Sequence, residues 1–247
     1  MNLHSLTSAL LAAGLCLANI GCMNAPGKPK LDAEAARPEQ VLDFPTLYKQ
    51  NCAACHGVDG KSGVAIALAN PVYLATAGID NVERVTAEGV HGTMMPPFGK
   101  RAGGMLTDAQ IASLARGIFN AWGRRDASAG VTPLPYASQG QGDPVRGQAA
   151  FVTFCASCHG VDGAGLVVQK SRRSDSIVDP AYLALVSDQG LRSTIIAGYP
   201  QQGMPDWRSD LKGANARAMT DQEITDIVAW MASHRIATPG QPYPQQR

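Results

Sequence analysis

The sequence predicts an all-α protein built from two similar domains. An internal repeat is the first observation: residues 70–75 align with 179–184 at an offset of 109, and residues 107–111 align with 220–224 at an offset of 113. The second is that apolar residues recur at helical spacing after residues 107 and 220. The third is that no competing stretch alternates apolar and polar residues as a strand does. Together they indicate a duplicated helical unit.

Each copy is expected to begin and end with a helix. Asp43 and Asp143 stand just before a proline at the start of the first helix, where Asp caps the helix and Pro fits the first turn. Two capping boxes, Thr107-X-X-Gln110 and Thr220-X-X-Glu223, open the last helix of each copy. Its apolar face is formed in the two copies by Ile111, Leu114, Ala115 and Ile118, and by Ile224, Ile227, Val228 and Met231. We expect this face to pack against the first helix of the same copy.

The pentapeptide Cys-X-X-Cys-His occurs twice, at residues 52–56 and 155–159. Two thiols one helical turn apart can add across the two vinyl groups of a haem, and the imidazole that follows can bind its iron. The pattern is the attachment signature of a c-type haem, and chance would give about 0.003 copies in a chain of this composition. The predicted covalent attachment residues are Cys52, Cys55, Cys155 and Cys158, and the predicted iron ligands are His56 and His159. The sequence thus predicts two haem c cofactors.

Two other interpretations of the cysteine pairs explain less. A four-thiolate zinc site does not account for the histidine after each pair. Structural zinc pairs also usually lie within about 20 residues of each other, whereas these lie 103 residues apart. A thioredoxin-like redox pair belongs in a βαβ context, which the flanking sequences lack.

With these motifs, each copy resembles a class I cytochrome c domain, and the whole chain resembles a dihaem cytochrome c. The resemblance covers about residues 40–123 and 143–236. It implies an all-α fold wrapped around each haem, with His56 and His159 as proximal ligands. It also implies that a methionine from a later loop binds each iron on the distal side.

The first copy offers four candidates for the distal ligand, namely His91, Met94, Met95 and Met105. At the offset of 109, Met95 aligns with Met204, whereas Met94 falls opposite Gly203 and His91 opposite Pro200. The runs that start at Met95 and Met204 also share the form Met-Pro-X-aromatic, which the distal loop takes in many class I cytochromes. We therefore expect Met95 and Met204 to be the distal ligands.

Composition predicts where the domains begin and end. Residues 124–142 hold the Gly, Pro and Ser typical of a linker, and residues 23–40 are rich in Pro, Ala and charge, as in a flexible tether. The expected segments are an export signal (1–22), a tether (23–40), a first cytochrome domain (41–123), a linker (124–142), a second cytochrome domain (143–236) and a C-terminal tail (237–247).

The N-terminus predicts export. An apolar run at residues 6–20 has no acidic residue beside it, as in a secretory signal, and it is shorter than the roughly 20 residues of a membrane-spanning helix. Its end, residues 19–22, resembles a bacterial lipoprotein processing site in which Cys22 receives the lipid, although Asn19 stands where that family usually has Leu. A plain secreted or uncleaved signal is the alternative. Since the remaining cysteines lie in the haem motifs or the signal, no structural disulfide is expected.

Charge excludes a nucleic-acid partner. The net charge is +1, with Lys plus Arg against Asp plus Glu at 6 against 6 in residues 40–123 and 9 against 10 in residues 143–236, so neither domain carries the basic surface that nucleic acid needs. A local basic run at residues 170–173 lies where the second copy is longer than the first. It is either a solvated loop or a docking patch for an acidic redox partner.

An iron with His on one side and Met on the other has no open position for a substrate, which favours electron transfer over catalysis. We expect a dihaem cytochrome on the periplasmic side of a bacterial inner membrane, held by the lipid or by membership of a complex. Its expected partners are a quinol-oxidising complex, a dehydrogenase or a terminal oxidase. The alternative is a dihaem peroxidase-like enzyme with one haem that can open; a haem-based sensor would need an output domain that the sequence lacks.

Overall fold

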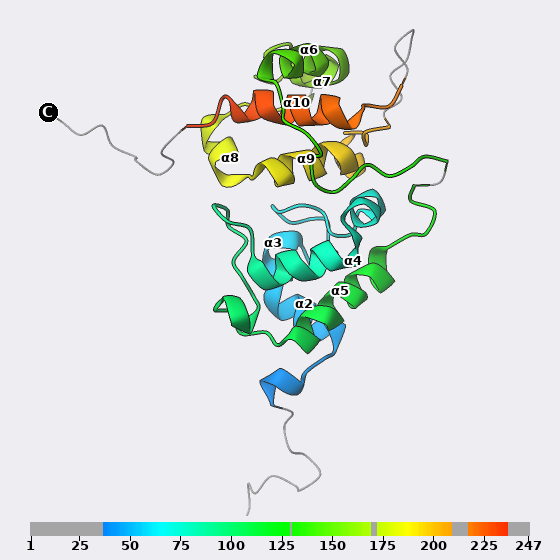
Figure 1. Ribbon diagram of the computed structural model, residues 1–247, viewed down its shortest axis with the longest axis vertical. Coiled ribbons are helices and arrows are strands. Elements are labelled where there is room, and N and C mark those ends of the chain that lie inside the picture. The colour runs from blue at the N-terminus through cyan, green and yellow to red at the C-terminus, as the bar shows by residue number, and fades with distance from the viewer. Residues whose placement is uncertain (1–36, 129, 169–171, 209–216, 237–247) are drawn as a thin grey trace, which may run out of the picture. The chain divides into compact units, whose positions relative to one another are not determined.

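The computed structural model describes residues 37–236 except 129, 169–171 and 209–216 (Figure 1). The predicted export signal with Cys22, most of the tether, the C-terminal tail and part of the basic run lie outside the described residues. The chain divides into two compact units after Gln40. Of the first unit, only the 3-10 turn η3 (Pro38–Gln40) is described in full. The second unit, residues 41–247, contains both haem attachment motifs.

This second unit is helical, as the sequence predicts (Figure 1). Its N-terminal half consists of α2 (Phe44–Asn51), α3 (Ala53–His56), α4 (Pro71–Glu88), η4 (Lys100–Ala102) and α5 (Asp108–Trp122). Its C-terminal half consists of α6 (Pro144–Phe154), α7 (Ala156–His159), α8 (Pro180–Leu185), α9 (Asp188–Ala197), η5 (Pro200–Gln202) and α10 (Asp221–Ala232). Among the described residues the strands are β1 (Val167–Val168) and β2 (Arg172–Arg173), a short antiparallel pair. β2 lies within the basic run at residues 170–173, where the second copy is longer than the first.

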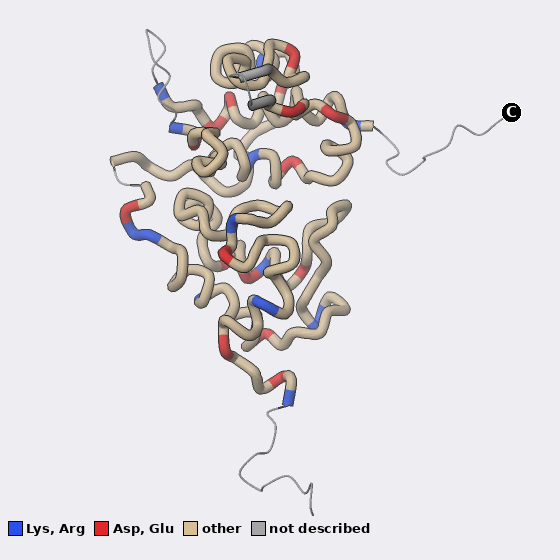
Figure 2. The backbone as a smooth tube through the Cα atoms, turned by 180° about the vertical axis from the view of Figure 1, so that it is seen from behind, with Lys and Arg blue, Asp and Glu red and all other residues tan. Residues whose placement is uncertain are grey.

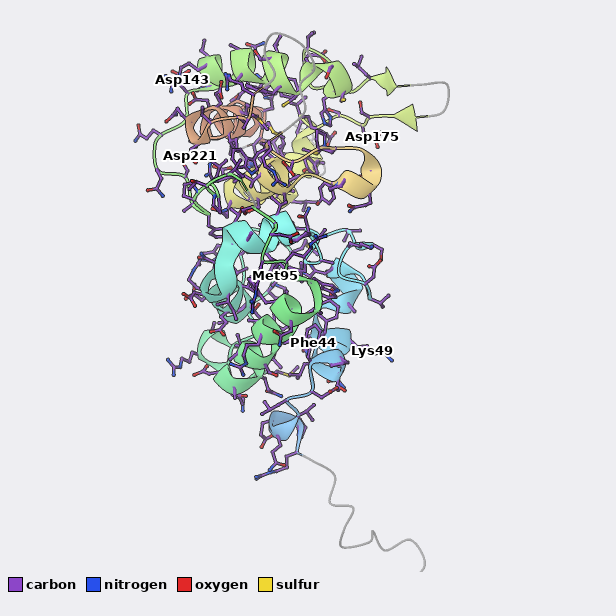
Figure 3. The ribbon with its side chains drawn as sticks, turned by 90° about the vertical axis from the view of Figure 1, so that its right-hand side faces the viewer. Phe44, Lys49, Met95, Asp143, Asp175 and Asp221 are labelled. Carbon is purple, nitrogen blue, oxygen red and sulfur yellow. The ribbon has the colours of Figure 1, made fainter. Side chains whose placement is uncertain are left out.

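The predicted helix starts are confirmed. The Asp43 carboxylate accepts from Thr46 N at 3.0 Å to cap α2, and the Asp143 carboxylate accepts from Val145 N at 2.8 Å to cap α6. Both capping boxes form completely, at the first turns of α5 and α10. Figure 3 labels Asp143 at the start of α6 and Asp221 at the start of α10.

The helical segment after each haem motif is interrupted at the same aligned position in the two halves. In the first half, α4 runs through a kink at Gly78, whose φ of 70° and ψ of 160° are not helical. In the second half the chain breaks into α8 and α9 at the aligned position, where Ser187 caps α9 by accepting from Gly190 N at 3.1 Å. Because glycine adopts a positive φ without a steric penalty, Gly78 turns the chain between the two helical stretches of α4.

The first and last helices of each half pack together, and the second half uses a glycine on the first helix. Gly147 of α6 lies directly on α10: a Cβ added there would stand 1.9 Å from Asp226 O and 2.8 Å from the Trp230 Cβ. The Trp230 ring then stacks on Phe151, with ring centroids 4.4 Å apart. The absence of a side chain at Gly147 is what lets the two helix backbones approach.

The first half uses the same arrangement with the roles exchanged. Phe44 of α2, labelled in Figure 3, aligns with Gly147, and Gly117 of α5 aligns with Trp230. The Phe44 ring lies on Gly117, where a Cβ would stand 2.1 Å from the Phe44 Cδ2. Each helix crossing therefore pairs one glycine with one aromatic residue, but on opposite helices in the two halves.

Each half has its own buried core. The first is centred on residues of α2, α4 and α5 such as Leu47, Leu74 and Leu114, and the second on residues of α6, α9 and α10 such as Phe151, Ile196 and Ile227. The two cores meet where α4 contacts α9. Ala197 of α9 is buried within the first core, and Val72 of α4 packs against the second.

The predicted linker is bound closely by the second half. Arg192, which is 2% exposed, donates from Nη2 to Pro135 O at 2.7 Å and from Nε to Tyr136 O at 3.0 Å. The same guanidinium pairs with the Asp221 carboxylate. The Tyr136 side chain packs against the first core. This tyrosine therefore connects the two halves through its backbone on one side and its ring on the other.

Candidate functional site

Each haem attachment motif forms a short helix directly after the first helix of its half. Cys52 joins α2 to α3, and Cys155 joins α6 to α7 in nearly the same backbone conformation. His56 N donates to Cys52 O at 3.0 Å, and His159 N donates to Cys155 O at 3.0 Å. The two thiols of each motif are thus spaced by one helical turn, which is the spacing that thioether bonds to two haem vinyl groups require.

The thiols do not have the character of a redox pair. Burial raises the pKa of the Cys52 thiol to about 11 and that of Cys155 to about 12. A thioredoxin-like pair has the opposite property, because its attacking thiol is acidic. Among the described residues there is also no group of three or more His, Cys, Asp or Glu side chains that could hold a metal ion.

The ring of His56 is oriented for binding through Nε2. Its Nδ1 lies 2.8 Å from Ile66 O, and since a carbonyl can only accept, Nδ1 carries the proton and Nε2 keeps its lone pair. Burial lowers the pKa of His56, although the Ile66 carbonyl acts in the opposite direction. A neutral imidazole with Nδ1 held by a backbone carbonyl is the form in which histidine binds a metal.

The described residues show less of the surroundings of the His159 ring. Burial lowers the pKa of His159 as well, but its Nδ1 is buried and has no hydrogen-bond partner among the described residues. The position that aligns with Ile66 at the offset of the cysteines is 169, which the described residues do not include. Burial favours the neutral form of both imidazoles, and among the described residues an Nδ1 held by a backbone carbonyl is seen at His56.

The chain turns sharply after each histidine. Gly57 and Gly160 have φ values of 83° and 79°, a region that glycine occupies readily. In the first site, the buried Tyr48 hydroxyl donates to Gly57 O at 2.9 Å. The same tyrosine ring packs on Trp122, with centroids 5.1 Å apart. The turn is thereby fixed to the last helix of its own domain.

The loops of the two predicted distal ligands share one backbone hydrogen bond at aligned positions. Met95 O accepts from Val90 N at 3.0 Å, and Met204 O accepts from Tyr199 N at 3.0 Å. Both methionine side chains are half-buried, and Figure 3 labels Met95 in the loop between α4 and η4. The sequence alignment therefore pairs two residues that occupy equivalent places in the fold.

The other candidates for the distal ligand lie at the surface. Met94 and Met105 are 78% and 83% exposed, and His91 is exposed. In the second half, His234 follows α10, and its Nδ1 lies 2.9 Å from Trp230 O. The geometry thus favours Met95 among the four candidates of the first half.

The side chains fit a c-type haem in both halves. The donor set comprises two thiols one turn apart, a neutral imidazole and a half-buried thioether, which are the groups that attach and ligate haem c. The charged residues marked in Figure 2 are of both signs in each half, as the sequence counts predict. None of the described helices is both long and apolar enough to span a membrane.

Sequence reasoning missed three supporting groups. They are the Ile66 carbonyl, the Tyr48 hydroxyl and the side-chain amide of Asn70, which donates to Ala197 O at 2.9 Å. A backbone carbonyl leaves no trace in sequence. Asn70 could have been noticed, because it aligns with Asp179 and differs from it by having a donor.

Comparison with protein families gives one match in each half. Residues 144–235 match the family described as "Cytochrome c". Residues 39–116 match the family described as "Cytochrome C oxidase, cbb3-type, subunit III". The two matches coincide with the two halves of the fold.

Similar curated proteins cover both halves together. The cbb3-type cytochrome c oxidase subunit FixPc of Rhizobium leguminosarum bv. viciae is 24% identical over 202 residues, 77% of this chain and 63% of that protein. The cbb3-type cytochrome c oxidase subunit CcoP of Cereibacter sphaeroides is 26% identical over 206 residues, 76% of this chain and 63% of that protein. This chain therefore spans less than two thirds of the length of these relatives.

Among solved structures, the Kuenenia stuttgartiensis reducing HAO-like protein complex covers 82% of this chain and 100% of the matched chain, at 15% identity and a TM-score of 0.41. A similarity this distant says nothing about function.

The family matches, the duplicated motif and the helical fold agree with one another. The chain consists of two cytochrome c domains and is a dihaem cytochrome c with two covalently bound haem c groups.

Proposed function

We propose that this cytochrome passes electrons toward a terminal oxidase of the cbb3 type, as a subunit or a closely associated donor. The similarity to FixPc and CcoP over both domains supports the partner class. We propose His56 with Met95 and His159 with Met204 as the axial ligands, and Cys52, Cys55, Cys155 and Cys158 as the attachment residues. The chain itself is proposed to carry electrons without catalysing a reaction.

The observation that carries the ligand proposal is the orientation of His56. With Nδ1 hydrogen-bonded to Ile66 O, Nε2 is the nitrogen left to bind iron. Each bound haem supplies one iron that changes between the ferrous and ferric states by one electron. The buried side chains of the two cores exclude water, and the half-buried Met95 and Met204 supply thioether sulfur, a ligand that favours ferrous iron.

Electron transfer to the oxidase can be tested directly. The holoprotein is reduced under anaerobic conditions and mixed with oxygenated membranes that contain or lack a cbb3-type oxidase, while the reduced haem bands are followed by stopped-flow absorption. We expect oxidation to be at least about tenfold faster with the oxidase present, because direct transfer from closed haems to oxygen is slow. Equal rates would contradict the proposal. Rapid turnover with hydrogen peroxide in the absence of oxidase would instead favour the peroxidase-like alternative.

We further propose that the protein acts on the periplasmic side of the membrane and is held there by a lipid on Cys22. The apolar run before Cys22 and the tether after it support this place. In the Cys22→Ser variant we expect the protein to move from the membrane to the soluble periplasmic fraction, because one sulfur is the site of the lipid. Immunoblots of fractionated cells check this, with Cys16→Ser as the matched control. Unchanged membrane association of Cys22→Ser would point to an uncleaved signal or to a partner complex.

A further inference from the structure

We propose that Asn70, a residue of the first domain, positions the distal ligand loop of the second haem site. Its side-chain amide holds the chain immediately before Tyr199, and Tyr199 pairs with Met204. The first domain then affects the position of Met204, the proposed iron ligand of the second, through a direct contact as well as through the chain that links the domains. This inference rests on the proposed assignment of Met204 as a distal ligand.

The side chain of Asn70 uses its two ends for different domains. Its Oδ1 accepts from Val72 N at 2.9 Å and Tyr73 N at 3.2 Å, and so caps α4 in the first domain. Its Nδ2 donates to Ala197 O at 2.9 Å and Gly198 O at 3.3 Å, at the end of α9 in the second domain. The donors on one side and the carbonyls on the other fix the orientation of the amide, since only nitrogen can donate.

The carbonyls that Asn70 binds belong to the base of the Met204 loop. Gly198 has a φ of 63°, and a Cβ on it would stand 2.7 Å from Met204 O and 2.4 Å from Pro205 O, so its backbone lies directly against the loop. The next residue, Tyr199, pairs with Met204 in both directions, by N–H···O bonds of 3.0 and 3.1 Å. A displacement of Gly198 therefore moves Met204 with it.

The hydrogen bonds of the Asn70 amide are buried, which raises the free-energy cost of losing them. Asn70 is 7% exposed and Ala197 is 2% exposed, and Val72 packs against the second core beside them. A buried carbonyl that loses its donor finds no water to replace it, so the loss costs more than an exposed hydrogen bond. The contact thus has a stabilising effect on one particular arrangement of the Met204 loop.

The equivalent residue of the second domain lacks this function. Asp179 aligns with Asn70, is exposed, and caps α8 by accepting from Tyr182 N at 2.8 Å. Its carboxylate has no donor when ionised. The contact is therefore asymmetric between the domains: Asn70 of the first binds the base of the distal loop of the second, and the aligned Asp179 caps α8 instead.

The substitution of Asn70 by Asp or Ser separates the two roles of the side chain. Both residues are good helix caps, so α4 keeps its start, and both lose the amide donor. Asn70→Asp adds a negative charge, whereas Asn70→Ser does not. Asp179→Asn, at the aligned and exposed position, is the matched control.

The experiment uses the full-length dihaem protein in the ferric state. Imidazole competes with methionine for the iron, so its apparent affinity at each haem measures how firmly the methionine is held. The near-infrared charge-transfer band of methionine-ligated ferric haem reports the two sites, and the Met204→His variant identifies the part of the band that belongs to the second. Redox potentials of both haems are measured on the same samples.

We expect Asn70→Asp and Asn70→Ser to raise the apparent imidazole affinity of the second haem about tenfold and to lower its potential, with the first haem unchanged. A tenfold change corresponds to about 1.4 kcal/mol, within the cost of leaving a buried carbonyl unpaired. Asp179→Asn should change neither site. A purely structural defect would act first on the haem of Asn70's own domain, so selectivity for the other haem is the decisive readout.

Four results would overturn the proposal. An unchanged second haem in both Asn70 variants, or equal changes at both haems, would show that Asn70 does not act on the Met204 loop. An effect of Asn70→Asp without one of Asn70→Ser would assign it to the added charge. If Met204→His leaves the whole methionine band intact, the ligand assignment itself is wrong, which distinguishes failure of the proposed site from failure of the coupling.

Discussion

Replacement of Gly147 by valine is expected to destabilise the second domain by about 3 kcal/mol, at the upper end of what overpacking of a close contact usually costs. The reason is steric: a Cβ at this position would stand 1.9 Å from Asp226 O, so α6 and α10 must separate. Separation also opens the stack between Phe151 and Trp230. Thermal unfolding of the ferric holoprotein, followed by circular dichroism, measures the effect as a fall of about 6–12 °C in Tm for a compact unit of this size.

The control for this variant is Ala149→Val. Ala149 lies on the same helix two residues later and is exposed, so the substitution costs only the lower helix propensity of valine, about 0.5 kcal/mol. Similar losses of stability in both variants would contradict the explanation, because the effect would then come from valine in the helix and not from the helix crossing.

Replacement of Met95 by histidine is expected to lower the potential of the first haem by at least about 0.1 V, a modest part of the roughly 0.8 V over which axial ligands set haem potentials. A second imidazole stabilises ferric iron more than a thioether does, so reduction becomes harder. Spectroelectrochemical titration of the full-length protein should show one haem shifted and the other in place. Met204→His should shift the other haem in the same direction.

The neighbouring residue supplies the control. Met94 is 78% exposed, and Met94→Leu removes its sulfur without adding a ligand, so both potentials should stay where they are. If Met94→Leu lowers a potential and removes the methionine band while Met95→His does neither, the ligand is Met94 and the alignment of the repeat has been misinterpreted.

Much of the fold could be predicted from short-range patterns in the sequence. The carboxylates of Asp43 and Asp143 and the boxes at Thr107 and Thr220 cap the helices as expected, because a cap depends on residues within one turn. The haem attachment motif is equally local. The repeat then paired Met95 with Met204, and each of these residues accepts at its backbone oxygen from the N–H five residues earlier; their role as ligands remains a prediction.

What the sequence did not reveal depends on contacts between distant segments. Trp122 and Trp230 both lie against the turn that follows a haem histidine, next to Gly60 and Gly163, yet the repeat aligns neither tryptophan with the other. The two rings lie beside equivalent turns, but they belong to different turns of α5 and α10. An alignment of the two copies therefore does not pair them. The cross-domain donor of Asn70 was missed for the same reason, since its acceptors lie 127 and 128 residues away.

The exchange of glycine and aromatic residue between the two helix crossings bears on how the chain folds. A duplicated protein risks pairing the first helix of one copy with the last helix of the other. If α2 met α10, Phe44 and Trp230 would compete for one space; if α6 met α5, Gly147 would face Gly117 across a void. Either error loses packing energy. The four residues therefore favour the pairing of α2 with α5 and of α6 with α10 during folding. This preference opposes misassembly of two similar domains in one chain.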